Sequence, residues 1–565
     1  DILNSLEEKK KYYRLKNGNI INLYEDDELQ QLNNLKDDMN LTNKDLVNKK
    51  GIIPKYRAIY LDSLKNDKYS IINTDNLFND LIEKFNTYKN IDIDFSKDKI
   101  LRDYQKVGVK WFYNIYKCGF GGILADEMGL GKSIQLIYLI KEILKEKKDA
   151  KILIVAPTSL IYNWKNEFDK FAKELKYKVF SENKKKREEE LNDISNINIL
   201  ITTYGLIRQD LDIYKEMSFE LMAIDEAQNI KNPNAQITKS IKQLIANTKI
   251  ALTGTPIENS VSELWSIFDF IMPGYLVNLK SFNKKYNTIE ENKLDDLQKQ
   301  ITPFILRRKK SDVILELPPK IENNIYIDLN KEQRALYIKE VEKTKEEIDK
   351  IIKEEGFNAA RFKILQLLTK LRELCVDPHI LYKNYPKESS KIEQLIKVVQ
   401  EIINNNHKIL IFTSFKTALE IVKEKLNENN ISTYTIDGSV SSKKRMELVS
   451  KFNKDNTNVF IITLKAGGTG LNLTGADVVI HLDLWWNPQV ENQATDRAHR
   501  IGQKNTVEVI KLICKGTIEQ RILELQDKKK KLANILLETE NRDQNIIASL
   551  SEADIKKLLQ LDNIE

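Results

Sequence analysis

Two series of short apolar segments dominate the pattern of hydrophobic and polar positions along the chain. Each segment is a nearly continuous run rich in Ile, Leu and Val, and stretches with helical periodicity separate the segments. Runs without alternating polar residues are typical of strands that are buried on both faces of a parallel sheet. The first series comprises residues 121–125, 151–157, 196–204, 220–225 and 249–255, and the second comprises residues 408–415, 432–437, 458–464, 477–484 and 507–513. We therefore predict an α/β protein with two lobes, each built around a parallel sheet.

The segments outside the two series set the expected domain boundaries. The first 98 residues carry only scattered apolar positions, which predicts short helices and loops. In the tail, Ser551 and Asp554 resemble a capping box, and Ile555, Leu558 and Leu559 share one helix face. We divide the chain into an N-terminal accessory region (1–98), a first lobe with a helical protrusion (99–318), a linker with a helical protrusion of the second lobe (319–385), the second lobe (386–520) and a C-terminal helical tail (521–565).

The composition excludes only a few classes of protein and of binding partner. The chain has 565 residues and a formal net charge of +7, so a polyanion partner would have to be bound by the placement of basic residues rather than by bulk charge. Three cysteines without paired spacing predict neither a disulfide framework nor a zinc site. No apolar run approaches the roughly 18 residues of a membrane span, so no membrane partner is expected. Because residue 1 is Asp, we expect the chain to continue a longer protein.

A glycine-rich loop follows the first apolar segment, in the string GGILADEMGLGKS (121–133). Gly129 and Gly131 allow backbone amides to approach phosphate oxygens, and a helix that begins near Lys132 adds favourable partial charge for an anion. Lys132 would reach the β- and γ-phosphates, and Ser133 would bind Mg²⁺. A strict Walker A loop has Gly where this chain has Asp126, which favours the shorter G-x-G-K-[ST] form.

Two adjacent acids end the fourth segment, in the string LMAIDEAQ. Asp225 and Glu226 at a strand tip suit a metal ion and a water molecule. We expect Asp225 to hold Mg²⁺ and Glu226 to orient or deprotonate the attacking water. The pair alone is a weak signal, since solvated acids also end strands.

The string QATDRAHRIGQ (493–503) carries two arginines three positions apart. Asn487 and Pro488 fit an N-cap and a first helical position, and Gly502 fits the position just past a helix end, so the pattern predicts one helix over 488–501. Gln493, Arg497 and Arg500 would then share one face, while Ala494, Ala498 and Ile501 would pack on the second lobe. The alternative is a solvated stripe, or pairs with Glu491 and Asp496.

These strings, in this order, resemble the SWI/SNF-type DNA translocases of helicase superfamily 2 over about residues 99–530. The strings that carry the resemblance are LRDYQKVGVKWF (101–112), DEMGLGKS (126–133), APTSL (156–160), ITTY (201–204), DEAQNIKN (225–232), LTGTPIEN (252–259), LRELCVDPHIL (371–381), ILIFTSF (409–415), TLKAGGTGLNLTGAD (463–477), WWNP (485–488) and QATDRAHRIGQ (493–503). Gln228 stands where many eukaryotic relatives carry His, which points to a bacterial-looking branch.

The resemblance implies two RecA-like lobes that close over Mg²⁺ and ATP, with Lys132, Asp225, Glu226, Arg497 and Arg500 as the catalytic residues. The two arginines would reach the γ-phosphate from the second lobe. The residues expected to bind ATP are Arg102, Gln105, Asp126, Gly129, Leu130, Gly131, Lys132, Ser133 and Gly470, with Gln105 reading the adenine edge. Thr253, Thr255 and Gln493 would couple the nucleotide state to lobe movement, and His499 would orient the lobe interface.

The family tracks double-stranded DNA through phosphate contacts, without reading sequence. The residues expected to contact DNA are Pro157, Thr158, Thr202, Thr203, Thr413, Ser414, Lys465, Gly468, Thr469 and Trp486. Each Thr or Ser taken alone is as typical of an ordinary strand end, and Trp486 has a core position as its alternative, while Trp485 is expected to pack.

The resemblance thus implies an ATP-dependent translocase that remodels protein–DNA complexes without separating strands. A monomeric motor with an unknown protein client, in the cytoplasm or at the nucleoid, is the matching expectation. A strand-separating helicase and an RNA-polymerase recycling factor with the same motor remain alternatives, and so does a binding module that has lost turnover.

Overall fold

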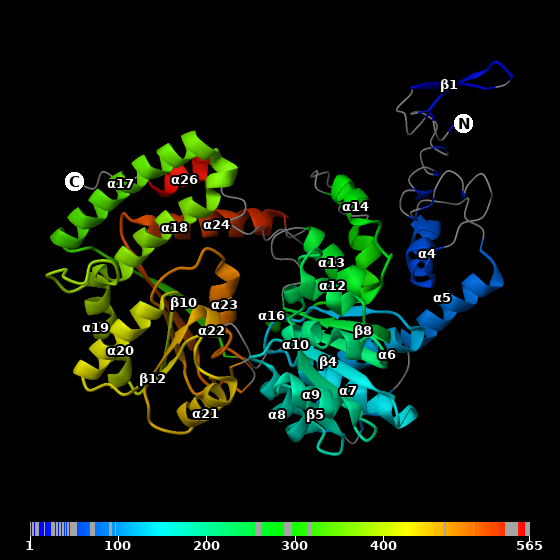
Figure 1. Ribbon diagram of the computed structural model, residues 1–565, viewed down its shortest axis with the longest axis horizontal. Coiled ribbons are helices and arrows are strands. Elements are labelled where there is room, and N and C mark those ends of the chain that lie inside the picture. The colour runs from blue at the N-terminus through cyan, green and yellow to red at the C-terminus, as the bar shows by residue number, and fades with distance from the viewer. Residues whose placement is uncertain are drawn as a thin grey trace.

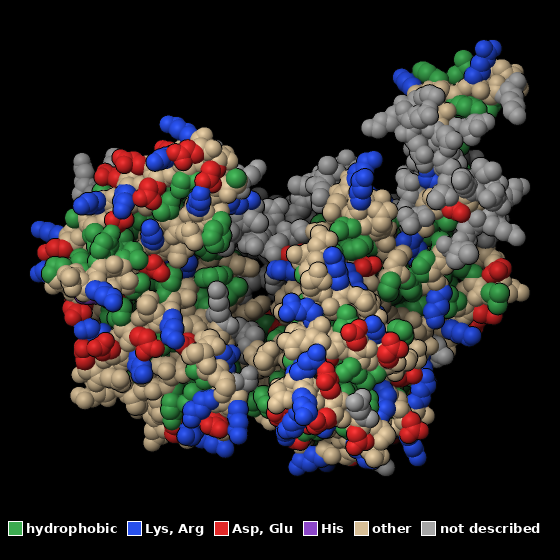
Figure 2. Space-filling model, in the orientation of Figure 1, with side chains coloured by type: hydrophobic (Ala, Val, Ile, Leu, Met, Phe, Trp, Pro, Cys, Tyr) green, Lys and Arg blue, Asp and Glu red, His purple; other side chains and the backbone are tan. Residues whose placement is uncertain are grey.

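Two lobes with parallel sheets lie side by side, the first coloured cyan to green and the second yellow to orange (Figure 1). The computed structural model describes residues 53–67, 74–89, 93–96 and 98–536 apart from 255–260, 287–296, 314–317, 468–470 and 501, together with 552–559 and parts of the first 52 residues. On the face shown in Figure 2, basic and acidic side chains are interspersed over both lobes. This mixture agrees with the small net charge.

The first lobe is built on a seven-stranded sheet in the order β5-β6-β4-β7-β8-β3-β9, all parallel, in the described part of the chain. Its strands are β3 (Gly122–Leu124), β4 (Ile152–Ala156), β5 (Tyr177–Val179), β6 (Ile199–Thr203), β7 (Ser218–Asp225), β8 (Ile245–Leu252) and β9 (Ile305–Leu306). Its helices are α6 (Asp103–Cys118), α7 (Lys132–Glu146), α8 (Ile161–Phe171), α9 (Lys184–Asn192), α10 (Tyr204–Gln209), α11 (Leu211–Tyr214), α12 (Gln236–Lys242), α13 (Val261–Ile271), α14 (Leu279–Tyr286) and α16 (Lys310–Val313), with short 3₁₀ turns at Ala227–Ile230 and Thr302–Phe304.

Both faces of this sheet are covered, which explains the continuous apolar runs. In β4, Ile152 and Ile154 belong to a core cluster that includes residues of α7 and α8. Leu153 and Val155 point the other way, into a cluster with α13. Successive side chains of a strand face opposite sides of a sheet, so every position of β4 has to be apolar.

The second lobe repeats this design with a six-stranded parallel sheet in the order β10-β15-β14-β11-β13-β12, counted over the described residues. Its strands are β10 (Lys320–Ile327), β11 (Ile409–Thr413), β12 (Thr433–Ile436), β13 (Val459–Thr463), β14 (Val478–His481) and β15 (Val507–Cys514). Its helices are α19 (Ser390–Asn404), α20 (Lys416–Glu428), α21 (Ser442–Phe452), α22 (Leu464–Gly467) and α23 (Pro488–Thr495).

All ten predicted strands are confirmed, and three further strands join the two sheets. Of these, β5 and β9 are only three and two residues long, too short for a periodic signal. The third, β10, is an edge strand whose first five residues are exposed, so its polar sequence KIENNIYI did not predict a strand. Because β9 belongs to the first sheet and β10 to the second, the chain crosses between lobes within residues 307–319, an interval that contains the expected boundary.

A helical layer packs beside the second lobe (Figure 1). It consists of α17 (Lys331–Glu355), α18 (Phe357–Val376), α24 (Ile518–Leu536) and α26 (Glu552–Leu558), with a 3₁₀ turn at Pro378–Ile380. The tail residues Ile555, Leu558 and Leu559 are 3%, 2% and 4% exposed in the core of this layer. The predicted apolar face of the tail helix is therefore confirmed.

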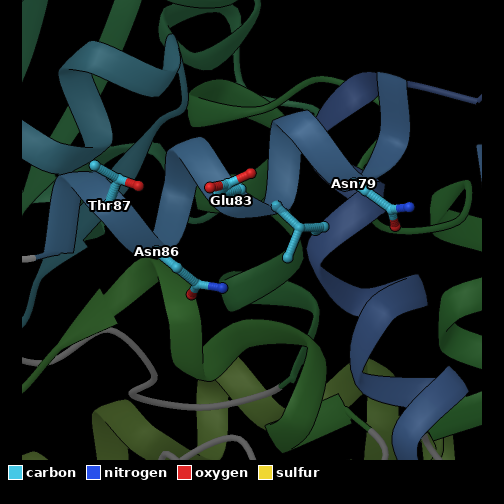
Figure 3. A pocket seen from close by; sticks show the side chains of 5 residues that line it. Asn79, Glu83, Asn86 and Thr87 are labelled. Carbon is cyan, nitrogen blue, oxygen red and sulfur yellow. The ribbon is translucent and has the colours of Figure 1, made fainter. Parts of the chain in front are cut away.

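The described part of the N-terminal region comprises β1 (Tyr12–Arg14), β2 (Ile20–Asn22), α4 (Ala58–Asp67) and α5 (Asn76–Lys89), with a 3₁₀ turn at Lys55–Arg57. Arg57 donates a hydrogen bond to the carbonyl of Gly274 at 2.8 Å, and Phe85 joins the first-lobe core. An open pocket of about 460 Å³ lies along α5 and is lined by Asn79, Ile82, Glu83, Asn86 and Thr87; the side chains of these residues are drawn in Figure 3. Within the described residues, no helix is long and apolar enough to cross a membrane.

The predicted helix over 488–501 is too long. Helix α23 ends at Thr495, and the next residues form turns. In the turn that follows, the carbonyl of Arg497 accepts the N–H of Leu473 at 3.0 Å. Gln493 therefore lies on the helix, whereas Arg497 and Arg500 lie on the turn that follows, which we call the arginine turn (residues 496–500).

Candidate active site between the lobes

The phosphate loop, residues 125–131, connects β3 to the first turn of α7. Gly129 and Gly131 have φ angles of +87° and +77°, a region that favours glycine because a Cβ atom is strained there. A Cβ atom on Gly131 would lie 2.5 Å from the side-chain amide nitrogen of Gln105. The glycines therefore give the loop both its conformation and its close contact with α6.

Lys132 begins α7, as predicted, and its side chain folds over the loop. Its Nζ donates a hydrogen bond to the carbonyl of Asp126 at 2.8 Å. Burial lowers the pKa of Lys132, while the charges of Glu226 and Asp225 oppose that shift. The three predicted catalytic groups of the first lobe are thus near enough to interact electrostatically.

The side chain of Asp126 is bonded within the protein, while its expected ATP-binding role stays a prediction. The residue is fully buried, and its carboxylate accepts hydrogen bonds from the Nε and Nη2 atoms of Arg308, the former at 2.9 Å, and from Gln135 at 3.2 Å. Arg308 follows β9, so this ion pair fastens the phosphate loop to the neighbouring strand. A buried carboxylate needs such partners, and they leave it a structural role.

Gln105 braces the phosphate loop from α6. Its amide nitrogen donates to the carbonyl of Leu130 at 3.1 Å, and its amide oxygen accepts the N–H of Arg102 at 3.0 Å in a capping box. Tyr104 also donates to the Leu130 carbonyl, at 3.0 Å. The expected contact between Gln105 and adenine stays a prediction, as does a nucleotide contact of Arg102.

The acid pair lies at the carboxyl edge of the first sheet. Asp225 accepts hydrogen bonds from the indole N–H of Trp164 and from the N–H of Glu226, both at 2.9 Å. Burial and the adjacent Glu226 raise the pKa of Asp225 to about 7, so a cation at this position would relieve an unfavourable charge. No group of three or more His, Cys, Asp and Glu among the described residues could hold a metal ion. Asp225 and Ser133 fit Mg²⁺, which proteins commonly bind through one or two carboxylates together with substrate phosphates.

Glu226 is connected to the segment after β8 through Gln228. The Gln228 amide donates to Glu226 Oε2 at 2.9 Å, and its oxygen accepts the hydroxyl of Thr253 at 3.0 Å. Thr253 is fully buried and its N–H donates to the carbonyl of Leu124. Gln228 thus links the expected base to the expected coupling residue, while Thr255 lies outside the described residues.

The arginine turn of the second lobe lies against the phosphate loop of the first. Arg497 Nη2 is 3.7 Å from the sulfur of Met128, and a Cβ atom on Gly129 would be 3.0 Å from Cβ of Arg500. Burial and Arg500 lower the pKa of Arg497 to about 10, whereas Glu226 raises it. The structure therefore places both arginine residues against the phosphate loop, while their contact with the γ-phosphate stays a prediction.

Buried side chains and hydrogen bonds connect the arginine turn to the second lobe. Ala494 and Ala498 are fully buried in its core, as predicted, while Ile501 is outside the described residues. Gln503 donates to the carbonyls of Ala476 at 2.8 Å and Ala498 at 3.2 Å. The carboxylates named as alternative partners are both engaged with lysines: Glu491 with Lys511 at 2.9 Å and Asp496 with Lys310 at 2.6 Å. His499 hydrogen-bonds to the carbonyl of Pro318 in the connection between lobes, in keeping with an orienting role.

Several side chains expected to contact DNA are buried and bonded within the protein, which favours the alternative interpretation of each. Thr202 donates to the carbonyl of Phe180, Thr203 caps α10, and Thr413 donates to Asp483 at 2.7 Å. Trp486 is 3% exposed in the core of the helical layer. These contacts favour the ordinary strand-end and core interpretations of the four side chains, and a contact of these residues with DNA stays a prediction.

The other expected DNA contacts stay predictions. Pro157 and Thr158 lie on the turn after β4, and Thr158 is exposed. Ser414 is half-buried, and its hydroxyl accepts a hydrogen bond from Arg372 at 3.1 Å. Gly468, Thr469 and the expected ATP contact Gly470 are outside the described residues, and so is the side chain of Lys465.

Three basic residues were not predicted as functional residues: Arg308, Lys310 and Arg372. Arg308 and Lys310 come from the string LRRKK (306–310), which directly follows an apolar PFIL and is the only signal that could have pointed to them. Arg372 comes from LRELC, and its guanidinium lies between Asp483 and the rings of Phe415, Trp485 and Trp486. Trp485 therefore packs, as predicted.

A phosphate loop and an acid pair on one lobe, facing two arginines on the other, define a two-lobed nucleoside triphosphatase. Residues 104–380 match the SNF2-related domain, residues 390–502 the helicase conserved C-terminal domain, and residues 1–95 the bacterial SNF2 helicase associated domain. The chain belongs to the SNF2 family of ATP-hydrolysing, helicase-like enzymes.

Named relatives agree with this assignment. An uncharacterized ATP-dependent helicase of Mycoplasma pneumoniae is 41% identical over 522 residues, 90% of this chain and 49% of that protein. A putative ATP-dependent helicase/translocase of Bacillus subtilis is 38% identical over 476 residues, 82% of this chain and 51% of that protein. The chain thus spans about half the length of these relatives. The solved SWI2/SNF2 ATPase core of Sulfolobus solfataricus with double-stranded DNA is 37% identical, covers 82% of this chain and 97% of its own, and has a TM-score of 0.40.

Proposed function

We propose that this chain is the motor of an ATP-driven translocase that moves along double-stranded DNA and remodels protein–DNA complexes without separating the strands. The observation that carries the proposal is the position of Arg497 and Arg500 of the second lobe against the phosphate loop of the first. A nucleotide site divided in this way couples hydrolysis to the relative position of the lobes. Movement of one lobe against the other is what a translocase requires.

In the proposed hydrolysis, Lys132 and the loop amides hold the β- and γ-phosphates, and Asp225 and Ser133 hold Mg²⁺. When bound there, the ion would supply positive charge opposite the charge that develops on the phosphates. Glu226 orients the attacking water and accepts its proton, which Gln228 helps by fixing one carboxylate oxygen. Arg497 and Arg500 stabilise the negative charge of the transferred phosphoryl group, a contribution of about a thousandfold or more in rate for arginine fingers.

Double-stranded DNA is the proposed track because the family motifs are those of SWI/SNF-type DNA translocases and the Bacillus subtilis relative is named a helicase/translocase. Contacts through Pro157, Thr158 and Ser414 would bind phosphates and would not read sequence. The proposed client is a protein bound to DNA, and the motor is proposed to work as a monomer.

The first test compares ATP hydrolysis without nucleic acid and with single-stranded DNA, duplex DNA or RNA. We expect duplex DNA to stimulate hydrolysis most. If duplex DNA does not change the rate of ATP hydrolysis, the proposal of a DNA translocase is contradicted. A binding module whose ATP turnover is not coupled to DNA would then be favoured.

A second test separates translocation from strand separation, which the helicase names of the relatives favour as the second candidate. We expect the protein to displace the third strand of a DNA triplex while a forked duplex stays annealed. Unwinding of the fork at a comparable rate would replace the translocase proposal with a strand-separating helicase.

A further inference from the structure

The segment after β9, residues 306–310, runs along the phosphate loop and is bonded to it at successive positions. The N–H of Ala125 donates to the carbonyl of Leu306 at 2.7 Å, and the N–H of Glu127 donates to the carbonyl of Arg308 at 3.0 Å. The N–H of Lys310 donates to the Glu127 carboxylate at 2.7 Å. With the Asp126–Arg308 pair between them, these bonds fix the backbone of Lys310 relative to the phosphate loop.

The side chain of Lys310 crosses to the other lobe. Its Nζ donates to Asp496 Oδ1 at 2.6 Å and to the carbonyl of His499 at 2.8 Å. These two acceptors lie at either end of the arginine turn: Asp496 directly precedes Arg497, and His499 directly precedes Arg500. One ammonium group thus holds both ends of the turn that carries the arginines.

The contact of Lys310 with the other lobe is shielded from water, since Lys310 is only 6% exposed. A buried ion pair adds little net stability once desolvation is counted, but its geometry is strict because a misplaced partner leaves a buried charge unsatisfied. Such a pair is suited to fixing position. The position matters here, because a misplacement of about 1 Å in a catalytic group can cost about a hundredfold in rate.

We propose that Lys310 is a positioning residue. It holds the arginine turn over the phosphate loop and so aligns the two halves of the nucleotide site. The inference rests on the proposed ATPase function of that site. Lys310 touches neither substrate nor metal in this role. It acts through Asp496 and the His499 carbonyl on Arg497 and Arg500.

The chain supplies a matched control, because the adjacent Lys309 is exposed. ATP hydrolysis at saturating duplex DNA is compared for the unmodified chain, Lys310→Met, Lys310→Arg and Lys309→Met. We expect Lys310→Met to lower kcat by about ten- to a hundredfold, with the KM for ATP and the binding of a fluorescent ADP analogue changed less than threefold. Lys310→Arg should recover most of kcat, because a guanidinium can donate to both acceptors, and Lys309→Met should match the unmodified chain.

Two results would overturn the proposal. One is a kcat of Lys310→Met within twofold of that of Lys309→Met. The other is a loss of ADP binding in parallel with kcat, which would indicate a damaged phosphate loop rather than a displaced arginine turn.

A readout without turnover separates this inference from the proposed function. Amide hydrogen exchange of residues 496–500 in the presence of ADP should rise at least about tenfold in Lys310→Met and stay unchanged in Lys309→Met. Unchanged exchange in both variants refutes the positioning role whatever the ATPase shows. If exchange rises in Lys310→Met but the unmodified chain does not hydrolyse ATP, the positioning role of Lys310 is supported. In that case only the proposed function is refuted.

Discussion

Glu226 has a backbone conformation that residues with a Cβ atom rarely adopt, with φ of 52° and ψ of 60°. Its neighbours hold it there: the Tyr204 hydroxyl donates to the carbonyl of Asp225 at 2.6 Å, and Asn229 donates to the carbonyl of Glu226 at 2.8 Å. Strain of this kind persists only where the surroundings over-determine it, and it is common at active sites. The strained turn is thus consistent with the expected catalytic role of Glu226.

Replacing Glu226 with Gln tests the base directly. The Gln side chain can still accept the hydrogen bond from Gln228, so the site keeps its geometry while it loses its proton acceptor. We expect nucleotide binding to change little and kcat to fall by about a hundredfold or more. Equilibrium binding of a fluorescent ATP analogue and steady-state hydrolysis measure the two effects, with Lys132→Ala as the contrasting variant that weakens binding. Normal turnover by Glu226→Gln would show that another group activates the water.

The Asp126–Arg308 pair predicts a stability effect at the same scale. Arg308→Met leaves the fully buried Asp126 carboxylate without its guanidinium, and removing one partner of a buried pair costs about 3–5 kcal/mol. Chemical denaturation should show this loss in the unfolding transition of the first lobe. The neighbouring Arg307 is exposed, so Arg307→Met is the control and should unfold like the unmodified chain. Equal unfolding of the two variants would mean that Asp126 finds other partners.

At the scale of elements, the sequence predicted best where hydrophobic burial alone determines the structure. The ten apolar strands are such elements, because burial on both faces leaves a continuous run of Ile, Leu and Val. Strand β10 was missed because it lies at an edge and exposes its first residues. The end of α23 was missed for another reason: the turn that follows it is bonded to Leu473, which lies 24 positions before Arg497, and no local pattern indicates that contact.

The residues of the candidate site fall into the same two groups: those that the sequence located and those that it did not. Lys132, Asp225 and Glu226 lie at strand and helix ends, and local motifs located them. Lys310 and Arg372 could not be located, because their partners Asp496 and Asp483 are more than a hundred positions away and only the fold brings them together. Thr202 and Thr413 show a different limit of sequence-based prediction. A polar residue at a strand end can form its hydrogen bonds inside the protein, and the sequence does not distinguish it from a residue that binds a partner.

Arg372 connects α18 of the helical layer to two strand ends of the second lobe. Its guanidinium donates to Asp483 at 2.9 Å and to the hydroxyl of Ser414 at 3.1 Å, and the residue is 2% exposed. Arg372→Leu should therefore destabilise the second lobe by about 3–5 kcal/mol, because it leaves Asp483 buried without a cation. The exposed Lys370 on the same helix gives the control Lys370→Leu. Differential scanning calorimetry measures both, and equal melting temperatures would contradict a structural role of Arg372.

At the scale of the whole molecule, the two lobes contact each other both at the nucleotide site and away from it. Lys310 binds Asp496, Arg497 contacts Met128, and further from the site Asn166 of α8 lies 3.9 Å from the sulfur of Met446 in α21. The first lobe carries the groups proposed to bind phosphate and metal, and the second lobe carries the two arginines. Because neither lobe has all of the proposed catalytic groups, we expect hydrolysis to depend on how the lobes are placed.

The division of the site predicts a specific pattern for the arginine variants. Arg497→Ala and Arg500→Ala should each lower kcat by about a thousandfold, since a guanidinium that stabilises the transferred phosphoryl group is lost. Nucleotide affinity should fall far less than in Lys132→Ala, because the groups that hold the ground-state phosphates belong to the first lobe. Duplex DNA should still bind to both variants but should no longer stimulate hydrolysis, and parallel measurements of DNA binding, nucleotide binding and turnover test each part. Lys504→Ala, at an exposed position just after the arginine turn, should behave like the unmodified chain. An arginine variant that retained DNA-stimulated hydrolysis would mean that the first lobe completes its chemistry alone, and lobe placement could then not be what couples DNA to ATP.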